Sequence, residues 1–325
     1  MRRIGRVSQL LAVYVLFLSG LWFTDAASAK HPYIVTGDTV VELSTDINGD
    51  VEGALFWKVG EGPPEVDRTS MAILKGLSVA GRLRLIAFNE ATLTKDAVAR
   101  FGELPPMETV YFCDSPVRDD VVSALKGKRL STLSLFGTHI TDASLKHIGK
   151  FSKLELLDLG STQVTGRGLA HLKTLRRLKR LSLKWTSTTD EDLAHLSGLV
   201  RLQELDLSHT KVTDEGLKHL ASLRSLRTLE LNSTDVGNEG LQQLQELGEL
   251  KRLSVVGTKV TSAVDGWARR KMPGLTVIIG FGAGGSSNVS KELPGNGSPL
   301  VMYGCGIPEV LEPKRGEKAS DSGGP

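Results

Sequence analysis

Three places in the sequence hold residue types that could do chemistry, and the first is a run of glycines. Residues 280–285 read GFGAGG and follow the apolar segment TVII, as the glycine-rich turn of a dinucleotide site follows a strand. Such a site also needs a helix directly after the turn and an acidic residue about 20 positions later. Here SSNVSKELPGNGSP follows, and Pro294 disfavours that helix. The pattern therefore predicts a flexible exit from a strand and no nucleotide site.

The second place is the segment DINGD, in which Asp46, Asn48 and Asp50 resemble the start of a calcium loop. A loop of the EF-hand type needs glycine at its sixth position and a bidentate glutamate at its twelfth. Val51 and Trp57 occupy those two positions instead. We therefore expect a surface turn without calcium.

The third is a set of four histidines spaced 24 residues apart: His147, His171, His195 and His219. Imidazoles in a row could share a transition metal, but no cysteine or carboxylate accompanies them at ligand spacing. We interpret them as a surface position that repeats along the chain. No nucleophile, base and orienting residue can be placed together either. The sequence therefore predicts no catalytic site, no metal and no cofactor.

Charge and the N-terminal segment indicate where the protein acts. Arg2, Arg3 and Arg6 precede an apolar run over residues 10–23 and the small residues AASA, which is typical of a signal peptide cleaved after Ala29. The apolar run is short for a membrane span, which needs about 20 residues. We therefore expect an exported protein, extracellular or in the periplasm or cell envelope, that touches a membrane only if this segment stays uncleaved.

The mature chain is close to neutral, because the formal charge of +3 falls to +1 when the three arginines and Asp25 of residues 1–29 are removed. The basic cluster of residues 176–184 is followed at once by acidic residues. Such a mixed surface excludes a general attraction to nucleic acid. Cys113 and Cys305 are the two cysteines, too few for a disulfide framework.

A repeat of 24 residues organises the middle of the chain. Six segments follow one another at this spacing, beginning at Leu130, Leu154, Leu178, Leu202, Leu226 and Leu250, and weaker copies start at Leu83 and Met107. About eight repeats are therefore readable between residues 83 and 279, with residues 30–82 as an N-terminal cap region that contains one or two strands and a helix near Met71. The Gly-, Ser- and Pro-rich residues 280–325 form a tail that we expect to be disordered.

The repeat that begins at Leu202 shows how one unit folds. Leu202, Leu205 and Leu207 have the spacing of a short strand, and Thr213 or Asp214 can cap a following helix of about three turns. The leucines of that helix, residues 217, 220 and 223, lie on one face. Neither element can bury its apolar side alone, so the units must stack into one parallel sheet with helices opposite.

The motif LxxLxL followed by TxVTDxGLxxL resembles the leucine-rich-repeat family, in particular its bacterial secreted subtype. The resemblance implies an α/β fold, a right-handed solenoid with parallel strands on the concave face and helices on the convex face. Thr recurs at the ninth position of six repeats, at residues 138, 162, 186, 210, 234 and 258. We expect these hydroxyls to bond the backbone of adjacent turns, whose polar groups would otherwise be buried unpaired.

Function in such a solenoid belongs to the strand residues between the buried leucines, which point to the concave side. Aromatic residues and arginine beside carboxylates are typical of an interface core. For the aromatic pair Phe136 and Trp185, packing between repeats is an equally good interpretation. The candidate binding strip comprises Tyr111, Phe136, Asp158, Arg180, Ser182, Lys184, Trp185, Glu204, Asp206, His209, Glu230 and Arg252.

The sequence thus favours a non-catalytic scaffold, expected to be monomeric, that binds a protein or peptide on this strip. One alternative is an adaptor that resembles the leucine-rich-repeat half of F-box substrate receptors. That class needs an F-box helix and cytosolic residence, and neither is evident in the sequence. Another alternative is a carbohydrate-binding or structural module of the cell envelope, which binding to a glycan array would distinguish.

Overall fold

The computed structural model describes residues 33–36, 39–45, 51–58, 64–80, 83–104 and 106–280. The predicted signal peptide, the calcium-like turn of residues 46–50 and the tail beyond residue 280 lie outside the described residues. Among the helices within these ranges, none is both long and apolar enough to cross a membrane.

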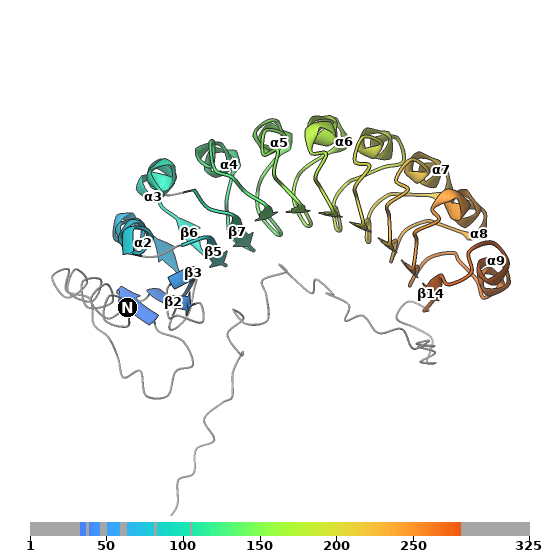
Figure 1. Cartoon of the computed structure of the whole chain (residues 1–325), viewed down its shortest axis with the longest axis horizontal. Helices are drawn as coiled ribbons and strands as arrows, with labels where there is room; N and C mark the ends of the chain where they lie inside the picture. The colour runs from blue at the N-terminus through green and yellow to red at the C-terminus, as the bar shows by residue number, and fades with distance from the viewer. Residues whose placement is uncertain are drawn as a thin grey trace, which may run out of the picture.

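The chain forms an arch with strands along its inner edge and helices along its outer edge (Figure 1). One sheet of 12 strands runs the length of the arch in the order β1-β2-β3-β5-β7-β8-β9-β10-β11-β12-β13-β14. Only β1, β2 and β3 pair antiparallel; from β3 onward every neighbouring pair is parallel. The strands are β1 (Tyr33–Thr36), β2 (Thr39–Thr45), β3 (Val51–Lys58), β5 (Leu85–Asn89), β7 (Thr109–Cys113), β8 (Thr132–Ser134), β9 (Leu156–Asp158), β10 (Arg180–Ser182), β11 (Glu204–Asp206), β12 (Thr228–Glu230), β13 (Arg252–Ser254) and β14 (Thr276–Ile278). A separate pair, β4 (Glu65–Val66) and β6 (Thr92–Leu93), lies outside this sheet.

The strand register reproduces the sequence period. Leu181 pairs with Leu205, and Leu205 pairs with Leu229, so from β8 to β14 each strand aligns with the residues 24 positions away. Because each repeat contributes one strand and one outer segment, 24 residues make one turn of the solenoid. The parallel sheet with helices on its outer side is the α/β repeat architecture that the leucine spacing predicts.

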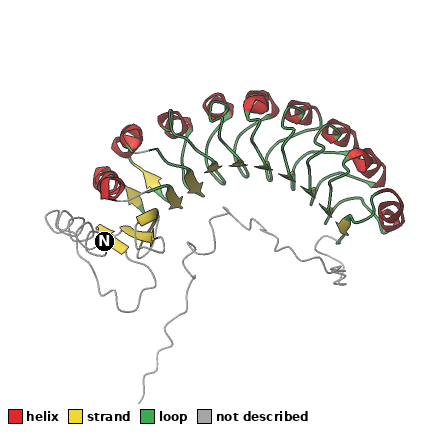
Figure 2. Ribbon diagram, viewed as in Figure 1, coloured by secondary structure: helices red, strands yellow, loops and turns green. Residues whose placement is uncertain are grey.

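The outer layer consists of short helices, which Figure 2 shows in red. The α-helices are α2 (Arg68–Ala80), α3 (Lys95–Arg100), α4 (Asp119–Ala124), α5 (Asp142–Ile148), α6 (Gly166–Leu169), α7 (Asp214–Leu217), α8 (Asn238–Leu241) and α9 (Ala263–Lys271). The 3₁₀ segments are η1 (Phe101–Glu103), η2 (Ala170–Thr174), η3 (Glu191–Leu196), η4 (Lys218–Leu220) and η5 (Gln242–Glu246).

For the repeat that begins at Leu202, the prediction of a three-turn helix is wrong in the length of the helix and partly in its type. A single α-helical turn, α7, passes into the 3₁₀ segment η4. The physical reason is the spacing of its buried leucines: Leu217, Leu220 and Leu223 lie three residues apart. A 3₁₀ helix has three residues per turn, so it keeps all three side chains facing the sheet, whereas an α-helix would rotate them progressively away.

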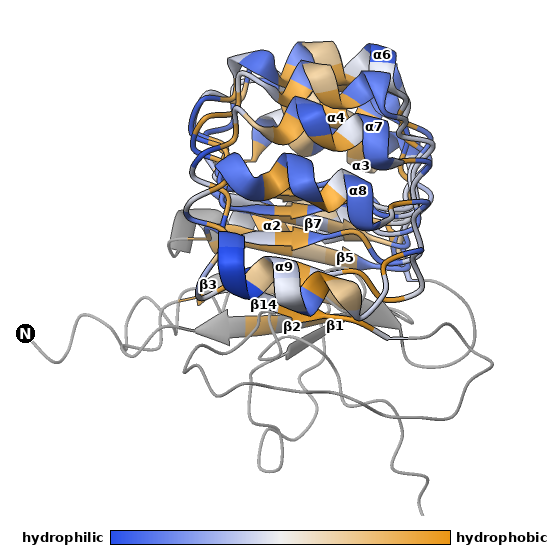
Figure 3. Ribbon diagram, turned by 90° about the vertical axis from the view of Figure 1, so that its right-hand side faces the viewer, coloured by the Kyte–Doolittle hydropathy of each residue, from blue (hydrophilic) through white to orange (hydrophobic). Residues whose placement is uncertain are grey.

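The core lies between the sheet and the outer segments and is built from aliphatic side chains stacked repeat upon repeat. Along the helices, hydrophobic residues alternate with hydrophilic ones (Figure 3). Near the N-terminus aromatic rings replace the leucines: Phe88 stacks between Phe56 and Phe112 at centroid distances of 5.0 and 5.2 Å. Residues 33–58 contribute three strands, β1 to β3, where the sequence predicted one or two.

The recurring threonine closes its own turn. Each of the six hydroxyls donates to the carbonyl three residues earlier, as Thr210 does to Leu207 at 2.6 Å. The expectation that these hydroxyls join adjacent turns is therefore wrong. Backbone groups connect adjacent turns instead. The N–H of Trp185 donates to the carbonyl of Ser208, and the N–H of His209 donates to the carbonyl of Asn232, each in the next repeat.

The TDxGL part of the motif links neighbouring repeats. The Asp190 carboxylate accepts the backbone N–H and the hydroxyl of Thr213, both at 2.7 Å. Asp142 binds Thr165 in the same way. Gly216 provides the space, since a Cβ there would lie 2.3 Å from an Asp190 oxygen. Threonine, aspartate and glycine thus recur together because one carboxylate of each repeat occupies the space left by a glycine in the next.

The junction between the repeats that begin at Leu154 and Leu178 departs from this pattern, and a carboxylate fills the space beside a glycine there as well. Gly166 stands where the aspartate would be, so Thr189 of the next repeat has no carboxylate from the preceding repeat. Asp192, at the position that is glycine in three other repeats, turns back and accepts the N–H and hydroxyl of Thr189 at 2.8 and 3.0 Å. A Cβ on Gly166 would lie 1.5 Å from an Asp192 oxygen. The two exceptions therefore compensate each other.

Candidate binding surface

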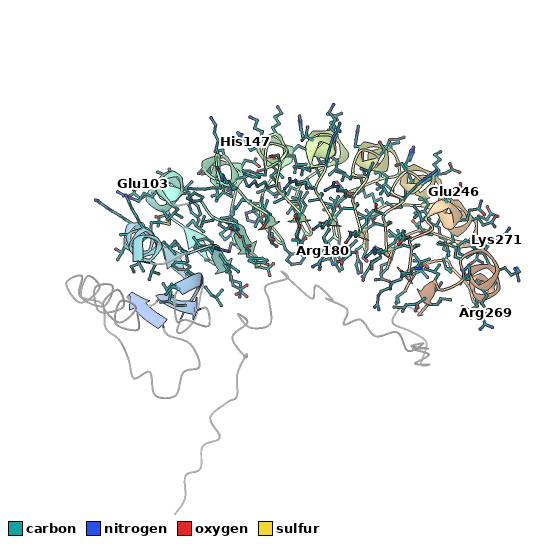
Figure 4. The ribbon with its side chains drawn as sticks, in the orientation of Figure 1. Glu103, His147, Arg180, Glu246, Arg269 and Lys271 are labelled. Carbon is teal, nitrogen blue, oxygen red and sulfur yellow. The ribbon has the colours of Figure 1, made fainter. Side chains whose placement is uncertain are left out.

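The concave residues form rows across the strands because parallel pairing places equal repeat positions side by side. One row contains Asp158, Ser182, Asp206 and Glu230, each the register partner of the next. Successive strand residues point to opposite faces, so this row lies on the face opposite the buried leucines. Figure 4 shows Arg180 at the inner edge of the arch and His147 at the outer edge. The structure thus brings most of the predicted strip together on one face.

Tyr111 and its neighbours form an apolar cluster at the N-terminal end of this face. Tyr111 is 6% exposed and packs with Leu55, Ala87 and Cys113, while Phe136 lies partly buried beside them. The sequence placed Tyr111 among surface contacts, but the structure buries its side chain. We therefore leave Tyr111 out of the proposed contact surface.

Asp158 is also buried, and the side chain of Lys184 extends past it toward Phe136. The Lys184 ammonium lies 4.9 Å from the centre of the Phe136 ring. The aliphatic part of the Lys184 side chain passes Gly160. A Cβ at this glycine would lie 2.9 Å from the Phe136 ring and 3.0 Å from Lys184. Burial raises the pKa of Asp158 to about 6, against the opposing effects of the Gly160 N–H and the Lys184 charge. Gly160, which the sequence analysis did not single out, is required for this arrangement.

The carboxylates of β11 and β12 form a half-buried polar centre of the strip. Arg180 and Glu204 make an ion pair at 3.2 Å. Asp206 accepts the N–H of Ser208 at 2.9 Å. Burial and the charge of Asp206 raise the pKa of Glu230, although Arg252 acts in the opposite direction. These residues are half-buried and face the same side.

Trp185 and His209 lie where β10 and β11 end, and their rings stack with centroids 3.6 Å apart and 8° between the planes. Trp185 is 56% exposed, so its side chain is not packed between the repeats. Burial lowers the pKa of His209, while Asp206 opposes the shift. The imidazole is therefore mostly neutral at neutral pH.

The backbone at this repeat position is left-handed, which sequence reasoning missed. φ is 59° at Trp185 and 57° at His209, and equivalent positions in other repeats also have positive φ. Non-glycine residues adopt this conformation at a cost of about 1 kcal/mol. The hint in the sequence was Gly137 and Gly257 at the same repeat position. Asn232 was missed as well; it accepts the Ser254 hydroxyl at 2.6 Å and the Val256 N–H at 2.9 Å and so holds β12 to β13.

The outer face of the arch provides less evidence of a functional site. The four histidines occupy equivalent positions of the outer segments, and the described residues contain no group of three or more His, Cys, Asp or Glu side chains arranged to hold a metal ion.

Comparison with known proteins agrees with the repeat. A family model described as "Leucine Rich repeat" matches residues 202–221 and 222–244. No curated protein matches the sequence. Two solved structures are similar, both from Listeria monocytogenes: an internalin C2 at 19% identity, covering 69% of this chain and 80% of that one with a TM-score of 0.42, and an internalin, InlF, at 17% identity, covering 64% and 69% with a TM-score of 0.46. The family model thus matches two neighbouring segments, residues 202–221 and 222–244, and the strand register of this chain continues with the same 24-residue spacing from β8 to β14.

Proposed function

We propose that this protein is a non-catalytic scaffold that binds a protein or peptide partner through the concave face of its solenoid. The observation that carries the proposal is Trp185. A large apolar side chain that is 56% exposed contributes little to the core, and its left-handed backbone costs stability that glycine would spare. Aromatic anchors with these properties are characteristic of binding surfaces.

The surroundings of Trp185 support the same function. Polar groups of both signs flank the ring within the strip, which suits recognition of a specific partner better than general adhesion. The sequence placed Lys184 among the contacts, but the structure buries it at 9% exposure, so it supports the surface instead. The proposed contact residues are Phe136, Arg180, Trp185, Glu204, Asp206, His209, Glu230 and Arg252. Asp158 supports this surface from below, since its side chain is 0% exposed.

A random-peptide display library screened against the full chain tests the proposal. Selected peptides should protect the amides of β10 to β12 from hydrogen exchange and should bind Trp185→Ala at least about tenfold more weakly, as expected for an interface anchor. Val200→Ala is the matched control, because Val200 is 55% exposed but lies outside the strands of the concave face. Failure to select any peptide, or protection confined to the outer segments, would refute a concave binding site.

Export is part of the same proposal and rests on the N-terminal pattern of residues 1–29. Expression with its own leader in a bacterial host should yield a mature chain that begins at Lys30, which intact-mass spectrometry of the periplasmic and medium fractions reports. Replacing Ala27 and Ala29 with Leu should block this cleavage. A full-length chain in the cytosol would contradict export.

A further inference from the structure

The two lateral edges of the solenoid differ in charge. One edge consists of the turns that lead from an outer segment to the next strand, and the other consists of the turns that lead from a strand to an outer segment. In Figure 3 the two sets of turns lie on opposite flanks of the outer helices. Five successive turns of the first kind carry twelve Lys and Arg side chains and one Glu, over residues 125–131, 149–155, 173–179, 197–203 and 221–227. We call these five turns the basic edge.

The opposite edge has the opposite charge. Its five matched turns carry seven acidic and two basic side chains, over residues 137–143, 161–167, 185–191, 209–215 and 233–239. Along the chain the two kinds of turn alternate, so basic residues are soon followed by acidic ones. The fold separates the charges, because every turn of one kind returns to the same side of the solenoid.

Four cations of the basic edge lie in one row. This cation row contains Arg129, Lys153, Arg177 and Arg201, which are 24 residues apart and exposed. Each of them precedes a leucine that is fully buried, which fixes its place in the turn. Two positions further on, the backbone N–H of one turn donates to the carbonyl of the turn before it, as Lys179 does to Glu155 at 2.8 Å. Successive cations are therefore held on adjacent turns, about 5 Å apart at the backbone.

Carboxylates of the protein neutralise little of the basic edge. Lys179 pairs with Glu155 at 2.6 Å, and Arg227 lies 3.9 Å from Glu249. Among the described residues, the other ten basic side chains of the edge make no ion pair within 4.0 Å. Like charges gathered on one surface repel one another, so an anionic partner would relieve a repulsion that the protein leaves in place.

Helix ends explain only part of this charge. Lys126, Lys150 and Lys173 lie within two residues of the end of an outer segment, where free carbonyl groups attract cations. The four members of the cation row lie three to five residues beyond those ends. The attraction of a helix end fades within its last turn. Stabilisation of the outer segments therefore does not account for the cation row.

The surroundings of the cation row indicate the shape of the anion. The turns before and after the basic edge are acidic, with Glu103 and Glu108 at one end and Glu246 and Glu249 at the other. A flat anionic membrane would contact these carboxylates together with the cation row, whereas a thin chain can follow the five basic turns alone. Within the described ranges no exposed aromatic ring lies on this edge, so nucleobases would find no ring to stack on.

From this geometry we infer that the basic edge binds a linear acidic polysaccharide, whose charged groups contact Arg129, Lys153, Arg177 and Arg201. Each guanidinium can hold a carboxylate or sulfate through two N–H groups, and the adjacent turn presents the next cation. One chain engages several cations at once, so contacts that are weak singly add up. The basic edge is separate from the concave face, and this inference goes beyond the proposed function.

A fluorescently labelled oligogalacturonate, which carries a carboxylate on every sugar, is a suitable probe. It is titrated into the full chain while the anisotropy of the label is followed. We expect saturable binding that weakens as salt is raised, because exposed charges are screened. The same oligomer with its carboxyl groups methyl-esterified is the uncharged control and should bind at least about tenfold more weakly.

Matched variants separate the cation row from total charge. Replacing its four cations with Gln should weaken oligogalacturonate binding by about tenfold or more, as expected for the loss of four exposed charge contacts. The control variant replaces with Gln four exposed cations that lie off the basic edge: Lys146, Arg167, Lys211 and Arg269. It removes the same charge and should lose at most about twofold. Far-ultraviolet circular dichroism verifies folding, and Arg177→Glu alone should weaken binding by about threefold if the fourfold variant does not fold.

The inference is overturned if oligogalacturonate does not bind, if the esterified oligomer binds as tightly, or if the cation-row variant keeps its affinity or loses no more than the control variant. Vesicles of phosphatidylglycerol and phosphatidylcholine and a DNA duplex are tested alongside. Binding of either one to the cation row without binding of oligogalacturonate would assign the edge to a membrane or to nucleic acid. Failure here is distinguishable from failure of the proposed function, because the cation-row variant should still bind the peptides selected for the concave face.

Discussion

Exchanging the two exceptional residues of one repeat junction should restore the motif that the junction between Asp190 and Thr213 uses. Gly166 and Asp192 each depart from the TDxGL pattern, and the Asp192 carboxylate fills the space that an aspartate at position 166 would need. We predict that Gly166→Asp and Asp192→Gly each destabilise the protein and that the double variant is close to wild type.

The magnitudes follow from the contacts. Asp192→Gly removes the carboxylate that accepts the N–H and hydroxyl of Thr189 at 2.8 and 3.0 Å. Hydrogen bonds to charged groups contribute about 1.5–3 kcal/mol each when buried, and this half-exposed pair together with the added glycine should cost about 2–3 kcal/mol. Gly166→Asp places a Cβ 1.5 Å from an Asp192 oxygen, so Asp192 must leave its site at a cost of about 1–3 kcal/mol.

The double variant reproduces the geometry of the junction between Asp190 and Thr213, in which Gly216 makes room for the carboxylate. Its free energy of unfolding should lie within about 1 kcal/mol of wild type, which corresponds to a coupling energy of about 3 kcal/mol, at the upper end for residues in contact. Urea denaturation of the full chain, followed by far-ultraviolet circular dichroism, measures all four proteins.

Asp235→Ala is the control for losing a carboxylate in itself. Asp235 pairs with Lys259 at 2.9 Å, but both side chains are largely exposed, so the loss should be at most about 0.5 kcal/mol. Effects of Gly166→Asp and Asp192→Gly that add within about 0.5 kcal/mol would show that the two sites do not share one carboxylate position. Compensation between the two exceptions would then be the wrong explanation of this junction.

Three further predictions concern the strip and the turns. Because burial raises the folded-state pKa of Asp158 from 3.8 to about 6, the contribution of this carboxyl to stability is largest below pH 4 and is lost as pH rises through 6. Asp158→Asn should remove this loss and be more stable than wild type by about 2–3 kcal/mol at pH 7.5 in urea denaturation, and equal pH profiles of the two proteins would contradict the burial argument. Trp185→Gly should be as stable as wild type or up to about 1 kcal/mol more stable, because glycine relieves the left-handed backbone, and a drop of several degrees in Tm would show that the indole belongs to the core. Thr210→Val should lose about 1–2 kcal/mol with the 2.6 Å bond to Leu207, while Thr210→Ser retains most of the stability; a larger loss in Thr210→Ser than in Thr210→Val would assign the role of Thr210 to its methyl group.

The sequence predicted which residues lie on the concave face, but it did not predict how exposed each of them is. Equal positions in successive repeats must align, so the strand residues between buried leucines were expected on one side, and Asp206 and Glu230 are found there. Their exposure was not predictable, because it depends on the neighbours in space. Lys184 covers Asp158 only because Gly160 leaves it room to reach Phe136. Tyr111 is buried by an apolar cluster that spans several strands.

The architecture follows from the amino-acid sequence alone. Leucines recur with a 24-residue period, each repeat is too small to bury its own apolar face, and stacking is therefore the stable arrangement. The sequence also determined which residues share a row. The hydrogen bonds that close and join the turns became evident in the folded chain: the threonine hydroxyl bonds within its own repeat, and the aspartate carboxylate binds the next repeat. The physical reason is that a period specifies which groups become neighbours, whereas hydrogen bonding and exposure depend on ångström-scale distances set by packing. Trp185 illustrates this division, since its place in the repeat is readable from the sequence while its stack on His209 and its exposure exist only in the folded arch.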